Sequence, residues 1–179
     1  MQGRLLPKYN DRYQAHPIGH WQEEFQLAVD LGLDCIEFIL DYNDFKNNPL
    51  MTTYGRQHIR SISKQTGVRV LSVCADYFME APLHADNEQT VLQSLDVLVK
   101  LIKVAVELKI KDIVIPCVDG SSLQNERLQD RFIETLNTIV PKAERNKVNL
   151  SLETDLDPSQ FENLLTVLDS PHVTVNYDI

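Results

Sequence analysis

Two carboxylates close two strand-like segments of this sequence. Glu153 ends the segment Val148–Glu153, and Asp178 ends the segment Val173–Asp178. In a parallel α/β barrel, the carboxyl ends of the strands open onto the active-site face. Carboxylate oxygens suit Mg²⁺, Mn²⁺ or Co²⁺, although two ligands rarely make a tight site. The alternatives are an acid that is solvated or caps the next helix for Glu153, and a frayed terminal residue for Asp178.

These acids belong to a regular alternation of strand and helix patterns. Five short apolar segments are typical of strands, and the first four each lead into a helical pattern. The expected strands are Cys35–Leu40, Val68–Cys74, Asp112–Val118, Val148–Glu153 and Val173–Asp178. The alternation predicts a parallel α/β sheet, and Met1–Pro7 reads as the remnant of a further strand. We expect an incomplete (β/α)₈ TIM barrel of about five to six βα units, forming a single partial domain over residues 1–179.

Several residues mark where the helices begin and end. Asp86 with Gln89 resembles a capping box that opens a helix to about residue 108. Asp157 followed by Pro158 predicts an N-cap and a proline at the first helical position. Pro141 should kink or end the helix that precedes it, and Pro116 weakens the later half of its strand.

Composition narrows the functional classes. The chain has 179 residues and a net charge of −9, without the basic cluster that nucleic-acid binding requires. We see neither a signal peptide nor an apolar run of ~18 residues that could cross a membrane. The three cysteines match no zinc spacing, so we expect reduced, buried thiols and a cytoplasmic location. Neither G-x-S-x-G nor G-x-G-x-x-G occurs, which weakens hydrolase and dinucleotide-binding interpretations.

Five segments, in this order and spacing, carry a resemblance to a known family. They are Met1-Gln2-Gly3-Arg4-Leu5, Trp21-Gln22-Glu23-Glu24-Phe25, Cys35-Ile36-Glu37-Phe38, Leu152-Glu153-Thr154-Asp155 and Val175-Asn176-Tyr177-Asp178. Together they resemble the sugar phosphate isomerase/epimerase group of the xylose-isomerase-like TIM barrel superfamily. The resemblance implies a divalent metal held by acids ending strands five and six, a His from strand seven and a Glu from strand eight. Glu153 and Asp178 match the first two, and we expect a truncated chain that lacks the last two.

The resemblance also implies a reaction. A metal such as Mn²⁺, Mg²⁺ or Co²⁺ would polarise the carbonyl of a sugar or sugar phosphate. Glu153 would then move a proton on the neighbouring carbon, as in 3-epimerisation or aldose–ketose isomerisation.

Four further residues are candidate substrate ligands. Glu37, in an apolar strand, either contacts a sugar hydroxyl or pairs with Arg4. Asn176 lies on the same side of its strand as Asp178, where a structural hydrogen bond is the favoured alternative. Asp76 and His84 follow the strand Val68–Cys74, and their alternative is a plain exposed loop residue. The turn Asp119-Gly120-Ser121-Ser122 could offer N–H groups to a phosphate, but a plain turn with a helix cap is the favoured interpretation.

Two other functional classes stay open. One is an inosose dehydratase-like lyase; a related apurinic endonuclease is opposed by the net charge of −9. The other is a non-catalytic barrel fragment that associates through its open sheet, since unpaired edge strands favour self-association.

Overall fold

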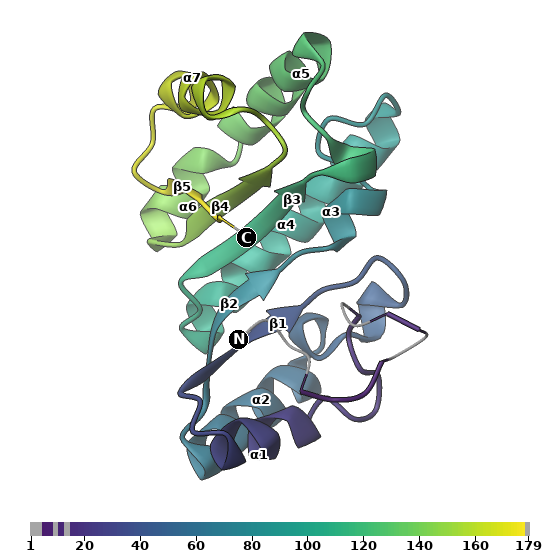
Figure 1. Ribbon diagram of the computed structural model, residues 1–179, viewed down its shortest axis with the longest axis vertical. Helices are drawn as coiled ribbons and strands as arrows, with labels where there is room; N and C mark the ends of the chain where they lie inside the picture. The colour runs from purple at the N-terminus through teal and green to yellow at the C-terminus, as the bar shows by residue number, and fades with distance from the viewer. Residues whose placement is uncertain (1–4, 9–10, 13–14, 178–179) are drawn as a thin grey trace.

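The computed structural model describes residues 5–8, 11–12 and 15–177, and its centre is a parallel sheet of five strands. The strands follow one another across the sheet in chain order, and each pairs in parallel with the next (Figure 1). They are β1 (Cys35–Ile39), β2 (Arg69–Cys74), β3 (Asp112–Cys117), β4 (Asn149–Thr154) and β5 (Val173–Val175). This order confirms the expected incomplete barrel.

Helices connect the strands and cover one face of the sheet; Figure 1 shows the longest, α4, behind β2 and β3. The helices are α1 (Glu23–Asp30), α2 (Thr53–Thr66), α3 (Tyr77–Glu80), α4 (Glu88–Leu108), α5 (Glu126–Asn137), α6 (Val140–Asn146) and α7 (Pro158–Leu168). Short 3₁₀ turns are η1 (Phe45–Asn47), η2 (Pro49–Met51) and η3 (Asp119–Ser121). No helix in the described ranges is both long and apolar enough to span a membrane.

Alternation along the strands separates two faces of the sheet. On one face, Ile113 and Leu150 join helix residues such as Phe25, Leu98 and Phe132 in the main core. On the opposite face, which in a closed barrel is the interior, a small apolar cluster consists of Ile39, Cys74 and Val114. The other strand positions on this second face are mostly polar, and we call it the inner face. Its polar residues are Glu37, Ser72, Asp112, Asn149, Ser151, Glu153 and Thr174.

One irregularity in the sheet matters for the inner face. Ile36 pairs with Val70, whereas Glu37 pairs with Ser72, so Leu71 is an extra residue in β2. A bulge of this kind re-aims the side chains that follow it. Here it places the hydroxyl of Ser72 beside the carboxyl of Glu37.

The predicted helix ends are confirmed in part. Asp157 forms the expected capping box with Gln160, and Pro158 is the first residue of α7. The N-cap of α4, however, is Asn87, whose side chain accepts the Thr90 N–H, so the prediction of a cap at Asp86 is wrong. The carboxylate of Asp86 instead pairs with two arginines of α5.

Both prolines behave as their missing N–H groups require. The helical pattern that precedes Pro141 is interrupted after Asn137, and Pro141 lies in the first turn of α6. Pro116 stays within β3, opposite Glu153 of β4. The pairing of β3 with β2 ends at Val114, so the position of Pro116 needs no ladder hydrogen bond on that side.

Three predictions about the strand-like segments need correction: two concern where strands lie, and one concerns the burial of a cysteine. β5 ends at Val175 rather than at Asp178, which lies outside the described residues. Residues 5–7, the described part of the expected strand remnant, form no strand. Cys35 is only partly buried, whereas Cys74 and Cys117 are buried as expected.

Candidate active site

Glu153 lies at the carboxyl end of β4. Its carboxylate accepts a hydrogen bond from Asn176, the residue that follows β5. Asn176 Nδ2 donates a hydrogen bond of 2.7 Å to Glu153 Oε2. The two residues meet because the backbone N–H of Asn176 continues the ladder to the Leu152 carbonyl at 2.8 Å. The structure therefore brings together two predicted site residues, and the amide fixes the direction of the carboxylate.

A separate network of polar side chains lies on the inner face, toward the amino ends of the strands. Asp112 accepts hydrogen bonds from Asn149 Nδ2 at 2.9 Å and from Ser151 Oγ at 3.4 Å. Ser151 Oγ is 2.9 Å from Thr174 Oγ1, and His172 Nδ1 is 2.9 Å from Asn149 Oδ1. The network links β3, β4 and the entry to β5, so each polar group stays satisfied and its rotamer is restrained. Sequence reasoning missed this network, although the period-two polar positions of β4 are its signal.

Glu37 shares the inner face with Glu153. Burial raises the pKa of Glu37 above its ordinary value, and the nearby charges of Glu153 and Asp112 act in the same direction. A hydrogen bond with Ser72 opposes the shift. Arg4, the alternative partner predicted for Glu37, lies outside the described residues. Glu37 is therefore a partly buried acid that faces the other carboxylates of the sheet.

Asp76 lines an open cavity of about 560 Å³ beyond the carboxyl ends of β1 and β2. The Cys74 thiol donates to Asp76 Oδ1 at 3.0 Å. Burial, reinforced by the charge of Asp76, raises the pKa of Cys74, so this thiol stays protonated. Arg12 and Asp41 line the same cavity.

Asp41 is a site candidate that sequence reasoning missed. Its carboxylate is buried, accepts the His16 backbone N–H at 2.5 Å and lies 3.4 Å from Arg12. Its position just after an apolar strand, like that of Glu153, is the signal that could have identified it.

His84 is the candidate whose surroundings differ most from the expectation of an exposed loop. The ring is only 4% exposed and meets the edge of Phe132 at 5.9 Å between ring centres. Burial lowers the pKa of His84 to about 4, and Arg131 acts in the same direction. Its charged neighbours, Arg131 and Asp86, belong to the outer layer rather than to the inner face.

The serines of the turn after β3 are engaged within the protein. Ser121 Oγ donates to the carbonyls of Pro116 and Val118, and Ser122 Oγ donates to Asp155 Oδ1 at 3.0 Å. These bonds fit the favoured interpretation of a plain turn, but the helix cap expected with it is wrong, since Asn125 caps α5.

The fit of a divalent cation depends on which acids the edge of the sheet offers. Within the described residues, no three or more His, Cys, Asp or Glu side chains converge as a metal site. Glu153 presents a carboxylate that is oriented by Asn176 at the carboxyl edge of the sheet. The oxygen donors of Glu153 and Asp178 are of the chemical type that Mg²⁺ or Mn²⁺ prefers.

Comparisons with known proteins agree with this architecture. Two solved structures share the fold: 3-keto-D-glucoside 4-epimerase YcjR from E. coli, with TM-score 0.69 and 15% identity, and a D-psicose 3-epimerase, with TM-score 0.70 and 14% identity. They cover 97% and 87% of this chain, which covers 65% and 56% of theirs. A related barrel from Mycobacterium smegmatis, with TM-score 0.68 and 17% identity, was crystallised with magnesium; it covers 90% of this chain, which covers 57% of it.

Sequence comparison identifies the family. L-ribulose-5-phosphate 3-epimerase UlaE of Salmonella paratyphi B is 31% identical over 143 residues, which are 78% of this chain and 50% of the relative. The chain thus spans about half the length of the curated relatives it matches. The family model described as xylose isomerase-like TIM barrel matches residues 25–179. The chain therefore belongs to the xylose isomerase-like TIM barrel family.

Proposed function

We propose that this chain carries part of the active site of a sugar or sugar-phosphate epimerase or isomerase, with Glu153 as its proton-transferring group. The observation that carries the proposal is the held carboxylate of Glu153 at the carboxyl edge of the sheet, fixed by Asn176 at 2.7 Å. The name of the sequence relative, L-ribulose-5-phosphate 3-epimerase, supports the substrate class.

The proposed step is a proton transfer beside a carbonyl. Glu153 takes the proton from the carbon next to the carbonyl, so a C–H bond breaks and an O–H bond forms on the carboxylate. The electron pair of the C–H bond forms a carbon–carbon double bond, and the carbonyl electrons move onto the oxygen. Return of a proton from solvent to the opposite face of the same carbon gives the epimer, and Glu153 gives up its proton to solvent. Return of the proton from Glu153 to the former carbonyl carbon gives the isomer, provided that the hydroxyl on the neighbouring carbon passes its proton to the former carbonyl oxygen and becomes the new carbonyl.

The chain's acids and amides have distinct proposed roles around this step. Glu153 and Asp178 would hold the divalent cation, which when bound polarises the carbonyl. Glu37 and Asp76 would accept hydrogen bonds from sugar hydroxyls. Asn176 mainly orients the Glu153 carboxylate through its Nδ2. It would contact the substrate only through the part of its amide that is not bonded to Glu153. We assign no substrate contact to His84, because its ring is buried against Phe132.

The direct test is product formation. The chain is incubated with L-ribulose 5-phosphate and Mn²⁺, and the products are followed by NMR. We expect the C3 epimer to form and EDTA to abolish it. A dehydrated product would favour the lyase alternative, since the same proton abstraction can be followed by loss of hydroxide. If the chain converts neither L-ribulose 5-phosphate nor unphosphorylated ketoses or aldoses, that result contradicts catalysis by this chain.

A second candidate, association without catalysis, is favoured by the edges of the sheet. In the described part of the chain, β1 and β5 each pair on one side only. At the end of β5, Val175 is 50% exposed, and Tyr177, two residues further on, is 81% exposed. An unpaired edge with exposed apolar side chains is a template for pairing with another chain.

A further inference from the structure

A second cavity lies at the opposite end of the sheet from Glu153. It measures about 310 Å³ and is formed by α2, the amino end of β2 and the carboxyl end of α4. Its apolar wall includes Ile59, Val70 and Leu108. β2 starts here at Arg69 and ends at Cys74, beside the cavity that Asp76 lines. The two cavities therefore lie at opposite ends of the same strand.

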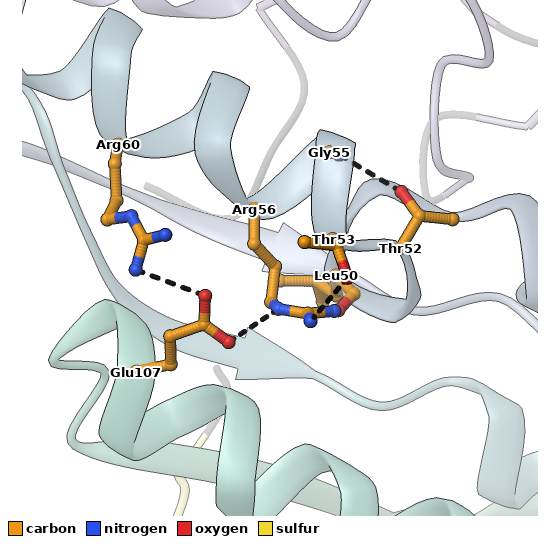
Figure 2. Close-up of polar contacts among 7 residues, drawn as sticks. All are labelled: Leu50, Thr52, Thr53, Gly55, Arg56, Arg60 and Glu107. Carbon is orange, nitrogen blue, oxygen red and sulfur yellow. Dashed lines mark hydrogen bonds and ion pairs between the residues drawn. The ribbon is translucent and has the colours of Figure 1, made fainter.

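The charged lining of this second cavity is unbalanced. Three cations, Arg60, Arg69 and Lys109, line it together with one carboxylate, Glu107. Figure 2 shows that both oxygens of Glu107 are already engaged: Arg56 Nε lies 2.6 Å from one and an Arg60 side-chain nitrogen 3.0 Å from the other. Glu107 is therefore shared between two guanidinium groups, one on each of its oxygens.

The other two cations have no acid of their own. Within the described residues, neither Arg69 nor Lys109 forms an ion pair, and both are exposed at the rim. Three positive charges against one negative charge stand out in a chain whose net charge is −9. Like charges that line one cavity repel one another, and a bound anion would relieve that repulsion.

Regular elements set the backbone positions around this cavity. Lys109 caps α4 in the left-handed conformation, with φ of 61°, and its N–H bonds to the Ala105 and Val106 carbonyls. Arg56, from the turn of α2 before Arg60, donates to the Leu50 carbonyl at 3.0 Å, which anchors the guanidinium that shares Glu107 (Figure 2). Lys109 is thus the C-cap of α4, and Arg69 is the first residue of β2.

We propose that this cavity binds a small organic dianion, a phosphate monoester or a dicarboxylate, with an apolar part. Arg69 and Lys109 would bind the anionic group, because a guanidinium matches the geometry of phosphate and carboxylate oxygens. The apolar part would lie against Ile59 and Leu108. The volume of about 310 Å³ falls at the lower end of small-molecule sites. This site does not rest on the proposed catalytic function.

The test is calorimetric titration of the chain with phenyl phosphate, phthalate and inorganic phosphate in about 0.1 M salt, where general charge attraction is screened. The test variant is R69Q/K109Q. The control variant is K64Q/K103Q, which removes the same charge from exposed positions of α2 and α4 outside the cavity. We expect R69Q/K109Q to weaken phenyl phosphate or phthalate binding at least roughly tenfold, and the control to change it by less than about twofold.

Each possible result of the titrations either supports or overturns the proposed anion site. Binding of phenyl phosphate alone identifies a phosphate monoester site, and binding of phthalate alone identifies a dicarboxylate site. No binding of either, or equal weakening by both double variants, overturns the proposal. Inorganic phosphate binding as tightly as phenyl phosphate overturns the apolar contact. Glu153 does not line this cavity, so Glu153→Gln should bind the probes as tightly as the unchanged chain does. The binding result therefore stands even where the catalytic proposal fails.

Discussion

At the scale of single residues, two acids of the inner face have different surroundings. Glu153 receives a hydrogen bond from Asn176, which fixes the orientation of its carboxylate. Glu37 is partly buried beside other carboxylates, which disfavours its charged form. The two acids therefore differ in their surroundings: the Glu153 carboxylate is oriented by an amide, whereas Glu37 lies where a charge is costly.

Glu37 therefore makes a pH-dependent contribution to stability. Its folded pKa is raised above the unfolded value, so its contribution is fully present below that unfolded value and is lost as pH rises through the folded pKa. We expect Glu37→Gln to raise the free energy of unfolding more at pH 7 than at pH 4, measured by urea denaturation. Glu162→Gln, an exposed acid on α7, is the control and should show no such difference. A gain for Glu37→Gln that is equal at both pH values would contradict the burial argument.

At the scale of elements, α2 depends on a close backbone contact. Gly55 lies in the first turn of this helix, and a Cβ built there would lie 2.4 Å from Pro49 Cα and from Pro49 O. Thr52 Oγ1 accepts the Gly55 N–H at 3.0 Å, which holds the helix start against η2 (Figure 2). The contact leaves no room for any side chain.

Gly55→Ala should consequently destabilise the protein by roughly 1–3 kcal/mol, because the neighbouring backbone must move. Chemical denaturation measures this change. Gly120→Ala is the matched control, since the nearest atom to its Cβ would be 4.0 Å away. Equal effects of the two substitutions would show that α2 and η2 are not packed as described.

The sequence predicts the elements well where a single segment contains the whole signal. The alternation Asn149-Leu150-Ser151-Leu152-Glu153 identifies β4 and its acid, and Asp157-Pro158 identifies the start of α7. It does not predict the contacts of His84 or Asp41, because those depend on partners 25 to 48 residues away, such as His16 and Phe132. The bulge at Leu71 is likewise invisible before β1 and β2 are paired.

At the scale of the whole molecule, the sheet has two edges that stay unpaired in the described ranges. The β5 edge carries the exposed side chains of Val175 and Tyr177. Closed barrels have no such edges, and an open edge favours pairing with a second chain.

We therefore expect the chain to self-associate in sedimentation velocity experiments. Val175→Lys should shift the equilibrium toward the monomer, because a charge on an edge strand opposes pairing. Val106→Lys is the control, since this residue is 49% exposed and belongs to α4, which lies behind β2 and β3 in the middle of the sheet. At a chain concentration of about 100 μM, even a weak dimer should be populated. A chain that stays monomeric there would contradict association through the sheet.

The central claim, that Glu153 transfers a proton on a sugar, is tested most directly by isotope exchange. The chain is incubated in D₂O with Mn²⁺ and L-ribulose 5-phosphate, and the C3 proton signal is followed by ¹H NMR. We expect the signal to disappear with the unchanged chain and with the Glu162→Gln control. Glu153→Gln should slow the exchange at least roughly a hundredfold, while its amide oxygen can still accept the Asn176 hydrogen bond. Exchange at the same rate in Glu153→Gln, or no exchange in the unchanged chain, would contradict the assignment.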